Sequence, residues 1–303
     1  SLQGSAYPGK FSLTFIQGLC PIFPHALDLG ILALFGLLAG VAAGFFGIGG
    51  GILFTPAFFI LFQEAGVQDP IPWAIGSSLF CTFTASLSST WQQYRSKNLY
   101  LREGVLVGAF GMAGVWMGKQ VTLSSLYSED IFIPFFAILM AVVAVLFFIK
   151  PDQEMNPPVV EGVNSPQRIR SKDAKMGVTG LFGGFLAALA GIGGGVAMVP
   201  LLNLALGIHL RRAVSISSSA IVLISFSGAL QFGLASPMLI DQVILPWSFG
   251  YIDGATILPV SILTWLGGGI GVRLGKKASL RVTSIGFAIL TVVVAVTMIS
   301  RLL

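Results

Sequence analysis

Charged side chains are scarce in this sequence, and cysteine and histidine are scarcer still. Asp, Glu, Lys and Arg together make up 10% of the 303 residues, whereas soluble domains carry about 25%. The two cysteines, Cys20 and Cys81, lie in apolar sequence without a Cys-x-x-Cys spacing, which disfavours a disulfide or a zinc site. We therefore expect no metal and no cofactor. The basic residues behind the net charge of +5 lie in short loops, so they do not indicate a nucleic-acid partner.

The sequence motifs of several enzyme and nucleotide-binding classes are also missing. The chain has no His-Glu-x-x-His, no Gly-x-Gly-Asp and no Gly-Lys-Ser/Thr. The acidic residues closest to apolar segments, such as Asp28, Asp241 and Asp253, stand near their ends. A cation site made of carboxylates, a buried proton relay and an intramembrane hydrolytic centre therefore lack their essential groups. We expect a protein that is not an enzyme.

Long apolar runs dominate what is present. Hydrophobic residues make up 55% of the chain, and several runs reach the roughly 20 residues needed to cross about 30 Å of hydrocarbon. This pattern predicts an all-α polytopic membrane protein that passes several times through the lipid bilayer of a cell membrane. The runs are 72–92, 104–118, 131–149, 178–206, 213–234, 255–275 and 282–299.

Lysine and arginine are concentrated in alternate loops. The basic loops are 95–102, 150–175, 207–212 and 273–281, and the segments that carry acidic residues without Lys or Arg are 63–71, 120–130 and 236–254. The positive-inside rule places the basic loops on the cytoplasmic side of the membrane. Corresponding helices of the two halves of the chain then run in opposite directions, which predicts an inverted-topology repeat.

One pentapeptide, Gly-Ile-Gly-Gly-Gly, occurs twice, at Gly47–Gly51 and at Gly191–Gly195. The surrounding segments 36–56 and 180–200 align with ten identities in 21 positions, which favours an internal duplication. Glycine runs break helices, and a helix broken in lipid is tolerated only where its backbone is buried in protein or lines a cavity. Paired breaks in the two halves of a membrane protein are the best sequence indicator of a transport site.

Both glycine strings are predicted to form the tips of re-entrant hairpins. The second leg of the later hairpin, 196–206, would measure about 16 Å as a helix, which is half of the bilayer. The alternative is a full crossing followed by a surface helix, which Arg211 and Arg212 argue against. Each half is then a broken, re-entrant hairpin plus three transmembrane helices. The predicted parts are an N-terminal interfacial segment at 1–26, a first repeat at 27–149, a cytoplasmic linker at 150–174 and a second repeat at 175–303.

Small and hydroxyl-bearing residues recur along the helices that follow the hairpins. When these two helices are aligned with each other, Ser78 matches Ser217, and Gln92 matches Gln231. The serines favour either close helix packing, with hydrogen bonds inside their own helix, or a row of neutral donors along a polar path. Three sets of glycines are interpreted as packing stripes. They are Gly36, Gly40 and Gly44; Gly111, Gly114 and Gly118; and Gly268, Gly271 and Gly275, the last two sets being matched member by member.

A small anion is the substrate that these groups favour. Backbone N–H groups of glycine turns and of helix N-termini bind anions. The first legs of the two hairpins end at the same place, and the negative ends of their helix dipoles there oppose the binding of an anion. A dinucleotide site is disfavoured because no strand precedes the glycines and no acidic residue follows them. The candidate substrate-binding residues are Gly49, Gly50, Gly51, Gly193, Gly194, Gly195, Ser77, Ser78, Ser217, Ser218, Gln92 and Gln231.

The doubled glycine pattern resembles the TauE/SafE family of sulfite exporters. The resemblance rests on Gly36–Pro56, Gly180–Pro200, Ala74–Leu79 and Gly250–Ile252, and it extends over about residues 27–302. It implies a transporter of the bacterial plasma membrane for sulfite or a related small sulfur-containing anion of the sulfonate type. The sequence departs from the family pattern at Ile216, which occupies the position of a threonine.

Two other functions remain open at this stage. One is transport of another small organic anion, and the other is a membrane scaffold without transport, although a scaffold would not need two broken helices. We expect the partners to be the small anionic substrate and the bilayer, with a homodimer as one candidate assembly. Neutral donors, rather than a fixed charge, suit an anion that must be released as well as bound.

Overall fold

The computed structural model of the chain describes residues 26–95, 99–149, 166–237, 247–278 and 280–300. Over these residues the chain is almost entirely helical, with one short β-hairpin. The predicted interfacial segment lies almost wholly outside this part of the chain. The elements are α2 (Ala26–Phe46), α3 (Gly51–Glu64), α4 (Pro70–Arg95), α5 (Leu101–Thr122), α6 (Glu129–Ile149), α7 (Pro166–Ala190), α8 (Gly195–Pro200), the π-helix η1 (Leu201–Ala205), α9 (Leu210–Gly233), β1 (Ser248–Phe249), β2 (Ile252–Asp253), α10 (Gly254–Lys277) and α11 (Leu280–Ile299).

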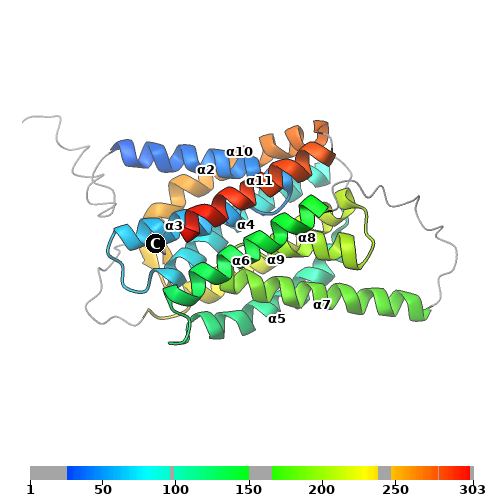
Figure 1. Cartoon of the computed structure of the whole chain (residues 1–303), viewed down its shortest axis with the longest axis horizontal. Helices are drawn as coiled ribbons and strands as arrows, with labels where there is room; N and C mark the ends of the chain where they lie inside the picture. The colour runs from blue at the N-terminus through cyan, green and yellow to red at the C-terminus, as the bar shows by residue number, and fades with distance from the viewer. Residues whose placement is uncertain (1–25, 96–98, 150–165, 238–246, 279, 301–303) are drawn as a thin grey trace, which may run out of the picture.

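Helices α2 and α3 form one hairpin, and α7 forms another with α8 and η1. In Figure 1, α2 runs from the left toward the middle of the molecule and α3 returns to the left, whereas α7 enters from the right and α8 turns back. A glycine string forms each tip. The returning leg of the second hairpin has six residues in α8 and five in η1, in agreement with the predicted half-bilayer length. The two hairpins enter the bundle from opposite ends.

Helix α7 begins at Pro166, within the segment predicted to be a linker. Proline is favoured in the first turn of a helix because its missing N–H would have no intrahelical acceptor there. Residues 167–175 then consist mostly of residues that propagate helices well, such as Gln, Arg, Lys and Ala. The segment predicted to be a linker is therefore helical from Pro166 onward.

Helices α4 and α9 pack against each other in the centre of the bundle and run in opposite directions. Gln93, near the end of α4, contacts Ser218, near the start of α9. Leu79, near the start of α4, lies against Gly228, near the end of α9. This antiparallel pair forms the wall against which both glycine turns are packed.

Glycines allow the first leg of each hairpin to pack closely on a helix of the other half, α2 on α10 and α7 on α5. A Cβ on Gly40 would lie 2.5 Å from the carbonyl oxygen of Thr264, and a Cβ on Gly184 would lie 1.9 Å from that of Gly111. Real Cβ atoms do not approach a backbone this closely, so larger residues would push the helices apart. The predicted packing role of the glycine stripes is confirmed.

The contacts correct the predicted match between α5 and α10. Gly114 lies against the carbonyl of Leu181, and Gly267 lies against that of Leu37. Because Leu37 and Leu181 occupy matched positions in the alignment of the two hairpins, Gly114 corresponds to Gly267 rather than to Gly271. The prediction was wrong by one helical turn, since glycines that recur every three or four positions align almost equally well after such a shift.

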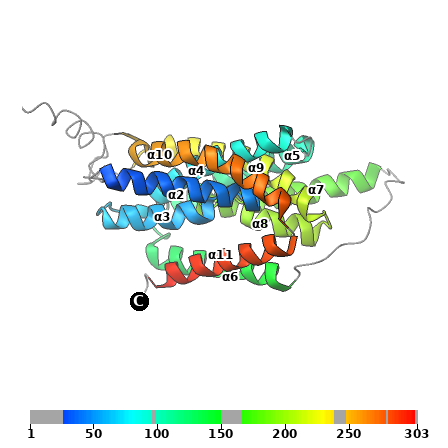
Figure 2. The same ribbon diagram turned by 90° about the horizontal axis from the view of Figure 1, so that it is seen from above.

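Helices α6 and α11 pack on each other and form a layer beside the other helices (Figure 2). Aromatic side chains join this layer to the hairpins. The ring centres of Phe59 in α3 and Phe132 in α6 are 5.2 Å apart, and those of Phe46 in α2 and Phe287 in α11 are 5.3 Å apart. Aromatic pairs at these distances stabilise the contact beyond the apolar area that they bury.

The outer surface of the bundle is apolar, and hydroxyl groups lie inside it, the reverse of a water-soluble protein. Trp116 of α5 and Ile262 of α10 are 60% and 61% exposed, whereas Ser78, Thr82 and Ser217 are fully buried. Three of the described helices contain a stretch long and apolar enough to cross a bilayer, at Glu129–Leu146, Arg211–Gly233 and Gly254–Gly275. The chain is an all-α membrane protein.

Where the structure describes them, the basic and the acidic loops lie at opposite ends of the bundle. At the basic end, Arg212 forms an ion pair of 2.9 Å with Glu103, and its guanidinium lies 4.5 Å from the centre of the Tyr100 ring. At the acidic end, the side-chain amide of Gln63 donates to the Glu129 carboxylate over 2.9 Å. The first two contacts join the basic loop 207–212 to the basic loop 95–102 and to the residue directly after it, and the third joins the acidic segments 63–71 and 120–130. The loops that alternate in charge along the sequence therefore lie at two different ends of the structure.

Candidate functional site

The two glycine turns lie side by side within the bundle. A Cβ on Gly51 would lie 2.5 Å from the Cα of Ile192, and a Cβ on Gly195 would lie 2.8 Å from the carbonyl oxygen of Ile48. The first string therefore runs along the second in the opposite direction, with backbone against backbone. Only glycine allows this approach at both positions.

Both turns have the same backbone conformation. The first, third and fourth residues of each string have positive φ values between 66° and 81°, a region that costs residues with a Cβ about 1–2 kcal/mol. The fourth residues, Gly50 and Gly194, are the N-caps of α3 and α8. The first N–H groups after an N-cap have no acceptor four residues earlier in their helix; those of Leu53 and Ala197 instead donate to the N-cap carbonyl oxygens of Gly50 and Gly194, at 2.9 and 3.2 Å.

Thr82 of α4 and Ile221 of α9 each touch both turns. A Cβ on Gly49 would lie 2.9 Å from Cγ2 of Thr82 and 3.0 Å from Cγ2 of Ile221, and a Cβ on Gly193 would lie 2.5 Å and 3.1 Å from the same two atoms. These two side chains also occupy matched positions when α4 is aligned with α9. We refer to Gly47–Gly51, Gly191–Gly195, Thr82 and Ile221 together as the junction.

Ser78 connects the second turn to α3 and α4. Its hydroxyl donates to the carbonyl oxygen of Gly191 at 2.8 Å and accepts a hydrogen bond from the Thr55 hydroxyl, also at 2.8 Å. Both side chains are fully buried. Ser78 is thus in contact with the junction, and its hydroxyl proton is donated to the Gly191 carbonyl.

Ser218 makes the corresponding contact with the first turn. It accepts a hydrogen bond from the Gln93 side-chain amide at 3.0 Å and donates to the Val214 carbonyl at 2.8 Å, with the Gly47 carbonyl oxygen 3.4 Å away. Gln93 is buried, whereas the neighbouring Gln92, which the sequence singled out, is half-buried. The amide of α4 that reaches this region belongs to Gln93.

The hydroxyl groups of Thr82 on α4 and Ser217 on α9 have no hydrogen-bond partner in the described part of the chain. Both residues are 0% exposed. A buried hydroxyl left unpaired costs about 1–3 kcal/mol, and most buried polar groups in folded proteins are paired. These two groups retain the capacity to donate a hydrogen bond to a ligand.

Ser77 and Gln231 lie toward the acidic end. The hydroxyl oxygen of Ser77 accepts the backbone N–H of Asp253 at 3.3 Å, and the Gln231 amide donates to Ser227 at 2.9 Å near the end of α9. Gln92 lies about four helical turns after Ser78, roughly 21 Å along the helix axis. The twelve predicted residues therefore do not converge on one point. The glycines, Ser78 and Ser218 lie at the turns, whereas Ser77, Gln92 and Gln231 lie apart. Ser217 directly precedes Ser218 in α9.

Sequence reasoning overlooked Thr55 and Gln93, and it included Thr82 only as a member of the row of neutral donors on one face of its helix. Thr55 directly precedes the proline that follows the first glycine string, and Thr82 lies between Ser78 and Ser86 on one helix face. Both had a positional signal. Gln93 had none, because adjacent residues point about 100° apart and the rotation of α4 about its axis decides which amide faces inward.

The junction is closed to both ends of the bundle. Every residue of both glycine strings is buried, as are Ser78 and Thr82 on α4 and Ser217 and Ser218 on α9. No Lys or Arg side chain is among the buried residues of the described chain. A ligand can reach the junction only when the helices move apart, and it would meet neutral donors there.

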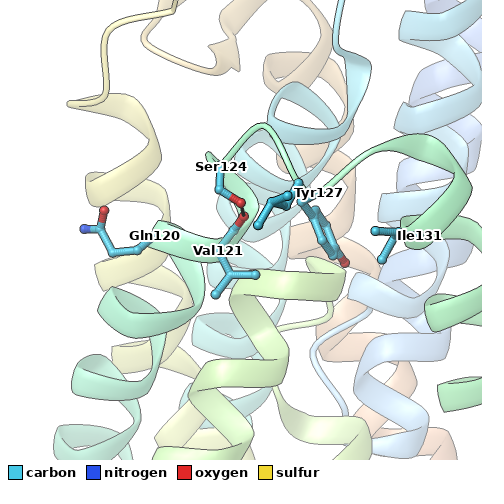
Figure 3. A pocket seen from close by; sticks show the side chains of 6 residues that line it. Gln120, Val121, Ser124, Tyr127 and Ile131 are labelled. Carbon is cyan, nitrogen blue, oxygen red and sulfur yellow. Dashed lines mark hydrogen bonds between the residues drawn. The ribbon is translucent and has the colours of Figure 1, made fainter.

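A cavity at the surface lies away from the junction, between the end of α5 and the start of α6 (Figure 3). Its volume is about 440 Å³. The Tyr127 hydroxyl donates to the Leu189 carbonyl at 2.9 Å, and the Gln120 side chain points away from Tyr127 (Figure 3). The lining is Gln120, Val121, Ser124, Leu126, Tyr127 and Ile131. This mainly apolar surface does not suit a small anion, and the described residues contain no cluster of metal-binding side chains.

Known proteins resemble this chain over most of its length. The family model described as sulfite exporter TauE/SafE matches residues 32–298. A probable membrane transporter protein of Methanocaldococcus jannaschii is 25% identical over 260 residues, 85% of this chain and 90% of that protein. The probable membrane transporter protein YunE of Bacillus subtilis is 28% identical over 258 residues (82% and 88%), and one of Haemophilus influenzae is 26% identical over 278 residues (88% and 96%). No solved structure matches the chain.

Proposed function

The chain belongs to the sulfite exporter TauE/SafE family of membrane transporters, and on that premise we propose that it carries sulfite or a related small sulfur-containing anion, such as a sulfonate, across the bacterial plasma membrane. The anion binds where the two glycine turns cross. Backbone N–H groups and hydroxyls hold it, and the protein does no covalent chemistry on it.

The observation that carries this proposal is the junction itself. Two left-handed glycine turns lie against each other, buried in a bundle whose outer surface is apolar. Broken helices in a membrane protein need such an interior position, and their free N–H groups bind anions. Binding through neutral donors is weak enough to allow release, which a transporter requires.

We also propose that the two halves form an inverted-topology repeat that opens alternately toward the basic end and the acidic end. Three observations support this. α2 packs on α10 as α7 packs on α5, α4 and α9 run antiparallel, and the two hairpins enter from opposite ends (Figure 1). In transporters of this design, movement of one repeat against the other exposes a central site to each side in turn.

Anion flux into proteoliposomes tests the proposed function. Purified protein would be reconstituted and the uptake of sulfite, methanesulfonate and acetate measured, with and without imposed pH and voltage gradients and against protein-free liposomes. We expect saturable uptake of sulfite or methanesulfonate in preference to acetate. Preference for acetate would instead favour a transporter of other organic anions, and the absence of saturable uptake for all three would favour a scaffold.

Cysteine labelling tests the inverted repeat. In a background with Cys20 and Cys81 replaced by alanine, single cysteines at the exposed positions Gln68, at the acidic end, and Arg102, at the basic end, would be treated with an impermeant reagent in sealed vesicles. The proposal requires labelling from opposite sides of the membrane. Labelling of both positions from the same side would contradict it.

A further inference from the structure

We propose that Thr122 and Tyr127 are positioning residues for anion binding, because their hydroxyl groups offset the negative end of α7 beside the second glycine turn. This inference rests on the transport function proposed above and assigns the anion to the side of the junction that the second turn forms. It follows from the contacts at the end of α7, from those at the matched end of α2 and from the field that a helix end produces.

Helices α2 and α7 both end at the junction, α2 at Phe46 and α7 at Ala190. The last carbonyl groups of a helix have no N–H partner within it, and they give that end a negative charge of about half an elementary charge. Both ends therefore repel an anion at the junction. A donor that pairs with these carbonyls reduces the repulsion, because its hydrogen brings positive charge to the carbonyl oxygen.

Two side-chain hydroxyls from outside α7 pair with its last carbonyl groups. Thr122, at the end of α5, donates to the Ala188 carbonyl at 2.9 Å, which is closer than its 3.2 Å contact with the Gly118 carbonyl of its own helix. Tyr127, between α5 and α6, donates to the Leu189 carbonyl at 2.9 Å. Both side chains are buried, and burial raises the pKa of the Tyr127 phenol above its usual value. The phenol therefore stays protonated at alkaline pH and remains a donor.

The matched end of α2 lacks both donors. Gly275 occupies the position of Thr122 in the corrected match of α10 with α5. It has no hydroxyl, although a Cβ there would lie 2.7 Å from a carbonyl oxygen in the last turn of α2. Tyr127 lies in the connection 123–128, whereas α10 and α11 are separated by residues 278 and 279 alone, neither of which is a tyrosine.

The carbonyl at the start of each turn shows the same difference. Gly191 accepts the Ser78 hydroxyl at 2.8 Å. The matched Gly47 carbonyl is 3.4 Å from Ser218, whose hydroxyl donates more closely to the Val214 carbonyl, at 2.8 Å. Three hydroxyls thus offset the negative end of α7, whereas the described contacts at the end of α2 include only this long one. An anion is repelled less beside the second turn, and we expect it to bind there.

The charge of the ligand distinguishes this role from simple support of the helix end. If the hydroxyls only stabilise the structure, their removal should weaken the binding of every anion by the same factor. If they offset a negative field, the loss of binding free energy is proportional to the charge of the ligand. The factor for a dianion is then the square of the factor for a monoanion of similar shape.

Equilibrium binding to protein in nanodiscs measures the effect at one alkaline pH, where sulfite is a dianion and methanesulfonate is a monoanion. Tyr127→Phe and Thr122→Val each remove one hydroxyl and keep the shape of the side chain. We expect each variant to raise the Kd for methanesulfonate roughly 2- to 5-fold, the range for a unit charge at a helix end. The Kd for sulfite should rise by the square of this factor, roughly 4- to 25-fold.

Two further variants are the controls. Thr122→Ser keeps the hydroxyl and should bind both anions as the unmodified protein does. Thr179→Val removes a hydrogen bond of 2.9 Å to the Lys175 carbonyl in the same helix, about 20 Å from the junction along the helix axis. It should lower the unfolding temperature without changing either Kd.

Unchanged Kd values in Tyr127→Phe and Thr122→Val would overturn the proposal, and so would an equal factor for the two anions. If one of these variants does not fold, the other decides by the same criteria. An unmodified protein that binds neither sulfite nor methanesulfonate would instead refute the proposed function itself, a result that is distinct from unchanged binding in the two variants.

Discussion

Helices α4 and α9 occupy matched positions beside the two glycine turns, but their polar groups are used differently. On α4, Ser78 binds the Gly191 carbonyl and the Thr55 hydroxyl, whereas on α9 the matched Ser217 has no partner in the described part of the chain. One turn further, Thr82 carries an unpaired hydroxyl and Ile221 carries none.

This difference shows which features of the two halves are constrained. The matched φ values of the first and second glycine strings are 70° and 69°, 81° and 66°, and 81° and 77°. The φ values are similar because the backbone of one string lies against the backbone of the other, and only glycine fits there. The side chains on α4 and α9 face the turns without this restriction, so they can diverge. The backbone conformation of the turns is therefore common to both halves, whereas the side chains that face the turns differ between the halves.

The largest expected effect comes from placing a methyl group at the N-cap of each returning leg. In Gly194→Ala the new Cβ would lie 2.4 Å from the carbonyl oxygen of Gly183, whereas in Gly50→Ala the nearest atoms, at 2.8 and 2.9 Å, belong to the side chains of Phe54 and Ala43. The left-handed backbone conformation lowers the free energy of unfolding of both variants by about 1–2 kcal/mol, and overpacking lowers it by about 1–3 kcal/mol more.

We expect Gly194→Ala to lose more unfolding free energy than Gly50→Ala, because a backbone carbonyl yields less easily than an aromatic ring. Denaturant unfolding in detergent measures both variants. Equal losses would mean that the two turns have equally rigid surroundings, which would weaken the comparison between the halves.

The next effect separates the two matched serines. Ser78→Ala leaves the Gly191 carbonyl and the Thr55 hydroxyl without their partner, so we expect a loss of about 1–3 kcal/mol in the free energy of unfolding. Ser217→Ala removes a hydroxyl that has no partner and should be nearly neutral or slightly stabilising. Thermal unfolding of the two variants side by side is the measurement. A larger loss for Ser217→Ala would contradict the structural distinction between the helices.

Much of the architecture was predictable from the sequence. The length of the apolar segments, the charge of the loops and the two glycine strings each depend on how the chain is placed in a bilayer. The order of the membrane helices and the short returning leg that ends at Ala205 follow from these signals, whereas the start of α7 at Pro166 does not. The site was less predictable. Which face of α4 meets the turns depends on tertiary packing, so Gln92 could not be distinguished from Gln93, and the shift of α10 against α5 by one turn left no trace in a repetitive glycine pattern.

The smallest effect distinguishes the loops that precede α4 and α9. Desolvation, and to a lesser extent the nearby Glu129, raise the pKa of Asp69 above its usual value, while the matched residue before α9 is Ile208. A carboxyl group with a raised pKa favours folding in its protonated form, so its contribution is lost as the pH rises through the folded-state pKa.

We expect Asp69→Asn to flatten the dependence of the unfolding temperature on pH above about pH 4, the usual pKa of aspartate. Asparagine also tolerates the positive φ of 53° at this position. Thermal unfolding across a pH series compares the variant with the unmodified protein. Identical pH profiles would show that Asp69 does not distinguish the two loops.

Equilibrium binding of radiolabelled sulfite to protein in nanodiscs tests whether the anion binds where the two glycine turns cross. Gly193→Ala would place a Cβ 2.5 Å from Thr82 Cγ2 and fill the crossing point, whereas Gly66→Ala adds the same group at a similar φ of 73° with no atom within 4 Å. We expect Gly193→Ala to lose saturable sulfite binding and Gly66→Ala to retain it. Binding by folded Gly193→Ala protein with the affinity of the unmodified protein would contradict the account.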